Sequence, residues 1–312
     1  MRELATAKRP LVIGIGGGGD VVGALAVAEH CRLFHGANPI VGGVTWERTP
    51  VDPEPGPRRV DEIANAMELA PGVLAASGDT AIRKSGVLFA ESRVAGMLGV
   101  QTVLVDVTIG PLAIADGLQA AAESMGCDLI VFLDVGGDAL AHGDEPGLGS
   151  PLCDAVMLAA ADLLAEREVP VLGALFGTGC DGELTPGEVL ERLAEVGVAG
   201  GLTGAVGLTP EVAGLIEQAV ETVPTEASAQ AVRAFRGVSG NVPIREGRRT
   251  VPLSPLAAVT FFFLIPAAVR SAARLALAVR GAADLDEANA ILRSLGVRTE
   301  LDWETQHGKQ GD

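Results

Sequence analysis

The chain has 312 residues, 48% of them hydrophobic and 20% charged, a composition that excludes a disordered or fibrous protein and allows a large core. Forty acidic residues against 23 Lys and Arg give a formal net charge of −17, which disfavours binding to nucleic acid or to anionic membrane surfaces. The 41 glycines and the 3% aromatic content predict an aliphatic core with close backbone approaches.

The amino-terminal half alternates apolar runs with helical patterns, which predicts parallel strands joined by helices. A strand from residue 11 is followed by a glycine turn and a helix that reaches about residue 34. A four-proline segment, residues 49–59, predicts an extended loop. Further strands are expected at residues 39–45, 72–77, 101–107, 129–133 and 169–176, and helices at residues 59–69, 111–125 and 151–167.

The carboxyl-terminal half has a mainly helical pattern. Helices are expected at residues 187–196, 210–220, 225–235, 267–279 and 284–295, with a short strand at 298–303. The basic, glycine-rich stretch 237–254 fits either a β-hairpin or a loop. We therefore expect an α/β fold with a mostly parallel, doubly wound (Rossmann-like) sheet. Its core would span residues 1–182, a helical portion 183–303 would pack on that core, and 304–312 would form a tail.

The chain carries no signal of secretion or membrane insertion. The first thirty residues lack the pattern of a signal peptide, and the longest apolar run, residues 256–269, is too short to span a bilayer. The four cysteines show no CxxC spacing, which favours free thiols over a disulfide or zinc framework. We expect a cytoplasmic protein.

The glycine turn at residues 11–20, LVIGIGGGGD, is the first candidate site. Gly14, Gly16 and Gly19 satisfy G-x-G-x-x-G after a strand, so Gly16, Gly17, Gly18 and Gly19 are predicted to contact substrate or phosphate. Asp20 argues against a dinucleotide site, because a carboxylate at the helix start repels a pyrophosphate. Asp20 then either caps the helix or helps to hold a divalent cation.

Two later turns also combine glycines with acids after a strand. Asp134, Gly136, Gly137 and Asp138 form the second turn, and Glu145 follows in a mobile loop. Gly179 and Asp181 belong to the third turn. Carboxyl ends of parallel strands meet at one sheet edge, so we expect these acids to gather there. Solvated loop acids and an Asx turn at Asp181 are the alternatives.

Each of these residues receives a predicted role. Asp20, Asp134, Asp138 and Asp181 are candidate metal ligands, and Asp138, Asp181 and Glu145 are candidate catalytic groups; Gly136, Gly137 and Gly179 are candidate substrate contacts. Glu47 and Arg48 precede the proline-rich loop, and Arg48 would meet the anionic part of the substrate.

Four stretches, IGGGGDVVGALA, GGVTWER with its DPEPGP loop, LDVGGDALAHGDEPGLGSPLCDA and GTGCDGEL, occur in this order. Together they resemble the archaeal and bacterial family called domain of unknown function 1152, over nearly the whole chain to about Trp303. The resemblance implies no activity. The short pattern ER-x-P-x-D with GGD is also similar to metal-dependent D-glutamate cyclases, but DVGGDAL lacks the Asn-Glu pair of their GDGGNE-like turn.

The leading hypothesis is a soluble enzyme that uses Mg²⁺ or Mn²⁺ on a small phosphate- or carboxylate-bearing metabolite, by lyase, hydrolase or transferase chemistry. One alternative is a nucleotide- or dinucleotide-binding protein that uses the GIGGGG loop. Another is a non-catalytic metabolite sensor or assembly subunit. The expected partners are a small molecule and further copies of the chain, without nucleic acid or membrane.

Overall fold

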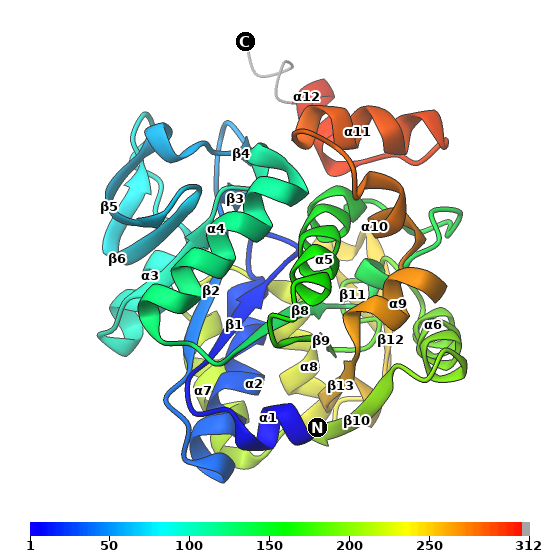
Figure 1. Ribbon diagram of the computed structural model, residues 1–312. Helices are drawn as coiled ribbons and strands as arrows, with labels where there is room; N and C mark the ends of the chain where they lie inside the picture. The colour runs from blue at the N-terminus through cyan, green and yellow to red at the C-terminus, as the bar shows by residue number, and fades with distance from the viewer. Residues whose placement is uncertain (308–312) are drawn as a thin grey trace.

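The computed structural model describes residues 1–307 and shows an α/β fold built on one large mixed sheet (Figure 1). The five central strands run parallel, and two antiparallel strands extend the sheet at each edge. Among the described residues, the strands of this sheet lie in the spatial order β10 (Leu202–Gly207), β13 (Val259–Phe263), β9 (Val171–Phe176), β8 (Leu129–Val135), β1 (Pro10–Gly14), β2 (Ile40–Val44), β7 (Thr102–Val105), β6 (Val73–Ile82) and β5 (Ile63–Ala70). The predicted α/β class is confirmed.

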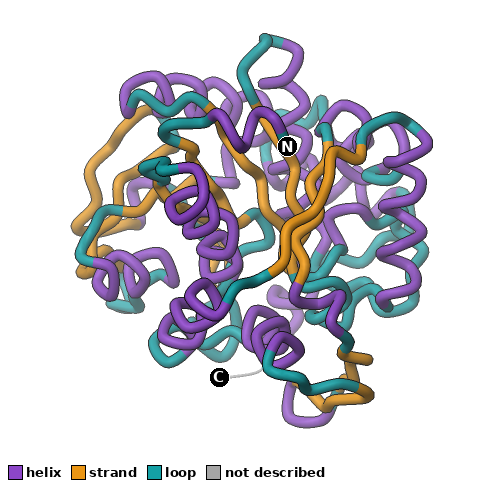
Figure 2. The backbone as a smooth tube through the Cα atoms, turned by 90° about the horizontal axis from the view of Figure 1, so that it is seen from below, coloured by secondary structure: helices purple, strands orange, loops and turns teal. Residues whose placement is uncertain are grey.

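Helices cover both faces of this sheet, as Figure 2 shows. One face packs against α1 (Arg2–Thr6), α2 (Asp20–His35), α3 (Ala90–Leu98), α7 (Pro210–Val220) and α8 (Glu226–Phe235). The other packs against α4 (Gly110–Met125), α5 (Pro151–Glu166), α6 (Pro186–Val198), α9 (Ile265–Ser271), α10 (Arg274–Val279) and α11 (Leu285–Ser294). Leu11 and Ile13 face one core and Val12 the other, which explains why β1 is a continuous apolar run.

The chain changes direction along the sheet at β1. The β1–α2–β2 unit runs to one side and the β8–α5–β9 unit to the other, with their helices on opposite faces. In open α/β sheets, ligands commonly bind at the carboxyl ends of the strands between two such units. The turns after β1 and β8 lie at these strand ends.

Several predicted elements were wrong. Residues 59–69 form a 3-10 turn, η1 (Val60–Glu62), and strand β5, because antiparallel pairing with β6 overrides their helical propensity. The expected strand at 298–303 is replaced by the start of helix α12 (Glu300–His307). The helix expected at 267–279 is divided into α9 and α10. Strands β10 and β13 were not predicted. They belong to the large sheet, and the portion 183–303 therefore contributes to it as well as to the helices.

Smaller elements complete the described chain. The stretch 237–254 is a hairpin of β11 (Gly240–Ile244) and β12 (Arg249–Leu253), and β3 (Trp46–Glu47) pairs with β4 (Gly56–Pro57). The remaining 3-10 turns are η2 (Val107–Ile109), η3 (Asp138–Leu140), η4 (Arg245–Gly247) and η5 (Pro255–Ala258). Of the predicted tail, residues 304–307 are helical and 308–312 lie outside the described residues. Within residues 1–307, every helix is too short or too polar to cross a membrane.

Candidate functional site

The three glycine-acid turns converge at the carboxyl ends of β1, β8 and β9. The Gly179 N–H donates to the carbonyl oxygen of Gly136 at 2.7 Å, which joins the second and third turns. Gly136 has φ +131°, and the carboxylate of Asp181 occupies the space that a Cβ atom would need there. Glycine at position 136 is therefore required for the close approach of the two turns.

One triad of carboxylates joins the first and second turns. Asp20 is the first residue of α2, Asp134 lies in β8, and Asp154 lies in the first turn of α5. One oxygen from each lies within 4.8 Å of the others, so the three can hold one metal ion. Asp134 and Asp154 are each only 2% exposed, whereas Asp20 is half-buried and accepts a 2.9 Å hydrogen bond from the Gly16 N–H.

The carboxylates of this first triad are short of partners. Oδ2 of Asp134 and Oδ1 of Asp154 are buried and have no hydrogen-bond partner among residues 1–307. Burial, together with mutual repulsion, raises the pKa of Asp134 and of Asp154 well above the ordinary value. Burial also raises the pKa of Asp20 to about 7. A divalent cation prefers oxygen ligands and would offset the repulsion.

A second triad lies beside the first and consists of Asp138, Asp181 and Glu183. Burial raises the pKa of Asp181 to about 8, with Glu183 adding to the effect, and Oδ1 of Asp181 has no partner in the described chain. Burial and the nearby Asp154 raise the pKa of Asp138 well above its usual range. Asp154 and Asp134 of the first triad thus help to raise the pKa of Asp138, and Asp181 of the second helps to raise the pKa of Asp134.

Glu183 differs from the two aspartates because its oxygens are already engaged. It accepts hydrogen bonds from the N–H groups of Gly149 and Ser150, at 2.7 and 2.8 Å, and from the Ser150 hydroxyl at 2.7 Å. Arg245 lies 3.4 Å from the same carboxylate. Glu183 therefore fixes the loop before α5, and Asp138 and Asp181 are the acids left available for chemistry.

The glycine loop after β1 is covered by protein groups. The Gly18 N–H donates to the Trp46 carbonyl at 2.9 Å, the Arg48 Nη2 donates to the Gly16 carbonyl at 2.6 Å, and Gly19 packs against Thr225. The Gly16 N–H is used by Asp20. This loop therefore shapes the position of Asp20, and the predicted contacts of Gly16 to Gly19 with phosphate stay a prediction.

Arg48 is held by the carboxyl-terminal helix, which lies at the top of Figure 1, far from α1. Its guanidinium lies 3.4 Å from Glu300 and 3.6 Å from Glu304, and it stacks over the Trp46 ring at 4.4 Å. Burial alone would lower the pKa of Arg48, but the two carboxylates raise it above its ordinary value. These inward contacts favour a structural role, and the predicted contact with a substrate anion is untested.

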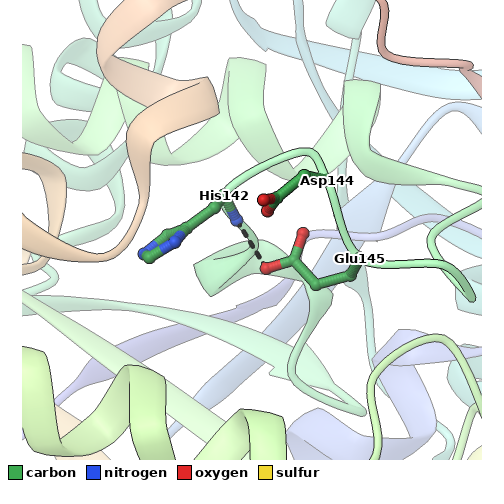
Figure 3. A group of neighbouring side chains, drawn as sticks. All are labelled: His142, Asp144 and Glu145. Carbon is green, nitrogen blue, oxygen red and sulfur yellow. Dashed lines mark hydrogen bonds between the residues drawn. The ribbon is translucent and has the colours of Figure 1, made fainter.

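Glu145 lies in a separate group with His142 and Asp144. Its oxygens accept the N–H groups of His142 and Gly143, both at 2.8 Å, and Figure 3 shows the first of these bonds. A ring nitrogen of His142 lies within 4.8 Å of an oxygen of Asp144 and of Glu145, and its Nε2 lies 2.9 Å from Glu195. The catalytic role predicted for Glu145 stays a prediction, but these bonds favour closing its own loop.

The sequence prediction missed three acids of this region: Asp154, Glu300 and Glu304. Pro151 marks the first turn of α5, so it placed Asp154 at the sheet edge where the other acids were expected. Glu300 accepts the N–H groups of Leu152 and Cys153 at 3.0 and 2.9 Å and so caps the same helix. No local pattern indicated Glu300 or Glu304, because their partners are distant in sequence.

The sequence profile of the family described as "Protein of unknown function (DUF1152)" matches residues 11–307. The chain belongs to this family. The matched span of this DUF1152 protein includes both triads, Arg48 and α12. No curated protein and no solved structure matches the chain significantly.

A buried acid beside the candidate site, Glu47, should make the stability of this chain depend on pH. Glu47 is 3% exposed, and its Oε1 accepts the Ala90 N–H at 2.5 Å at the start of α3. Burial raises its pKa from 4.5 to about 7. Stability from the protonated form is complete below pH 4.5 and is lost as the pH rises through 7, a change of about 3 kcal/mol.

Glu47→Gln keeps the acceptor oxygen and removes the titration. We expect the difference in free energy of unfolding between Glu47→Gln and wild type to shift in favour of the variant by about 3 kcal/mol from pH 5 to pH 8. Urea denaturation at the two pH values measures it. Glu68→Gln, at an exposed position on β5, should leave the wild-type pH profile unchanged. A Glu47→Gln profile parallel to that of wild type would contradict this assignment.

Proposed function

We propose that this DUF1152 protein is a divalent-metal-dependent enzyme that acts on a small anionic metabolite. Asp20, Asp134 and Asp154 would hold Mg²⁺ or Mn²⁺, and the substrate would bind in the crevice typical of Rossmann-like sheets. The observation that carries the proposal is the pair of buried carboxylate oxygens without partners, Asp134 Oδ2 and Asp154 Oδ1. Unpartnered buried carboxylates are costly, and a cation between them removes that cost.

The acids would divide the chemistry between them. A bound divalent cation supplies charge neutralisation for an anionic substrate and a lowered pKa for a bound water. Asp181, with a pKa of about 8, is largely protonated at neutral pH and would donate a proton to a leaving group. Asp138, beside it, would hold or accept a proton in the same step. These roles suit a lyase, a hydrolase or a transferase.

The direct test is binding of Mn²⁺ to the metal-free protein, measured by isothermal titration calorimetry at pH 8. We expect Asp154→Asn to weaken Mn²⁺ binding at least about tenfold, which is about 1.4 kcal/mol. Binding should also weaken from pH 8 to pH 6, because protons compete for carboxylates with raised pKa values. Asp144→Asn, in the separate group with His142, is the matched control and should bind as wild type does.

Two outcomes would contradict the proposal. Loss of Mn²⁺ binding in Asp144→Asn but not in Asp154→Asn would place the ion in the wrong group. A protein that binds Mn²⁺ but turns over nothing in a panel of phosphorylated and carboxylated metabolites would be a sensor. Where turnover is found, Asp181→Asn should abolish it without loss of Mn²⁺ binding.

A further inference from the structure

A pocket of about 470 Å³ lies next to the second triad, within the range of about 300–1,000 Å³ of small-molecule sites. Three segments distant in sequence form its wall: the loop before α5, the β11–β12 hairpin and the chain that leads into α12. Its lining includes Gly149, Gly182, Arg249 and Arg298.

The charge of this pocket is opposite to that of the chain. Its lining contains two arginines, Arg249 and Arg298, and no acid, although the protein has a net charge of −17. Arg249 is held in place, because its Nη1 donates to the Gly182 carbonyl at 3.1 Å and lies 3.8 Å from Glu183, which stands behind the pocket wall. Arg298 is exposed to solvent at the pocket wall. The pocket is therefore a local positive site in an acidic protein.

The pocket and the second triad share one turn. Gly182, which lines the pocket, lies between Asp181 and Glu183 in the turn after β9. Gly149, which also lines the pocket, donates its N–H to Glu183. A ligand whose anionic group lies in this pocket can thus extend toward Asp181.

We propose that Arg249 and Arg298 bind the phosphate group of a phosphorylated substrate, an assignment that rests on the proposed metal-dependent function. A phosphate monoester carries a charge of about −1.5 to −2 at neutral pH, which two guanidinium groups match. Arginine also binds phosphate through paired hydrogen bonds. The arginines would position the substrate, and the acids would act on it.

The test uses inorganic phosphate as the probe and the full-length protein in EDTA, by calorimetric titration at pH 7.5. We expect Arg298→Ala to weaken phosphate binding at least about tenfold, and Arg249→Ala with Arg298→Ala to remove measurable binding. Arg248→Ala, on the same hairpin with its side chain 71% exposed and outside the pocket lining, is the matched control and should bind as wild type does. Circular dichroism of each variant checks that the fold is retained.

Phosphate binding that is equal in wild type and Arg298→Ala would overturn the proposal. Acetate that competes with phosphate at equal concentration would overturn the phosphate class in favour of a carboxylate. The phosphate titration contains no divalent cation, so a negative result there does not affect the Mn²⁺ titration of Asp154→Asn. A negative result in the Mn²⁺ titration likewise does not affect the phosphate titration.

Discussion

Replacement of Arg48 by methionine is expected to lower the free energy of unfolding by roughly 3–5 kcal/mol, the usual cost of removing one partner from a buried ion pair. Glu300 and Glu304 are 4% and 5% exposed, and both face the Arg48 guanidinium. Methionine keeps much of the side-chain volume but leaves these carboxylates without their cation. Urea denaturation at pH 7 measures the change.

Arg59→Met is the matched control, because the Arg59 side chain is 72% exposed and pairs only loosely with Asp61, at 3.7 Å. Its effect should stay within roughly 0.5 kcal/mol. If Arg48→Met also stayed within 1 kcal/mol, Arg48 would not be the group that holds α12. Its guanidinium would then be available for the substrate contact that the sequence predicted.

The second large effect is an increase in the free energy of unfolding. In the metal-free protein at pH 8, Asp154→Asn is expected to raise the free energy of unfolding by roughly 1–3 kcal/mol, the usual cost of an unpartnered buried group. Asparagine removes one of the mutually repelling charges of the first triad, and its amide can donate to the neighbouring carboxylates. Because the pKa of Asp154 is raised, the gain should grow as the pH rises.

Asp162 provides the contrast on the same helix. It pairs with Arg280 at 2.8 Å and is 7% exposed, so Asp162→Asn should destabilise the protein. Thermal unfolding of both variants in EDTA should show a higher melting temperature for Asp154→Asn and a lower one for Asp162→Asn than for wild type. A loss of stability in both would mean that Asp154 is an ordinary structural acid without the strain expected of a cation ligand.

The sequence predicted the central part of the fold because local patterns determine it. Strands β1, β2, β7, β8 and β9 are apolar runs bounded by turns, and buried parallel strands have this pattern. The edge strands were harder to predict. β5 contains the helix-favouring residues Met67 and Glu68, and only its pairing with β6 makes it a strand.

The candidate site was also predictable where local sequence patterns mark it. Glycine-acid turns after strands indicated Asp20, Asp134, Asp138 and Asp181, and the structure brings these four together in two triads. Asp154 was missed because it lies inside a helical pattern, where an acid is usually a surface residue. The contacts of Arg48 depend on α12, a short segment that has too few residues for a helical period to be recognised.

The contacts of Trp46 and Arg48 with α12 can form only late in the synthesis of the chain. Arg48 and Glu300 are 252 residues apart, and Trp46 and Glu304, joined by a 2.9 Å hydrogen bond, are 258 residues apart. At a synthesis rate of roughly 5–20 residues per second, the amino-terminal glycine loop waits roughly 13–50 s for these partners. A nascent chain therefore has the first turn before it has these partners, and the turn is secured only once residues 300–304 have left the ribosome.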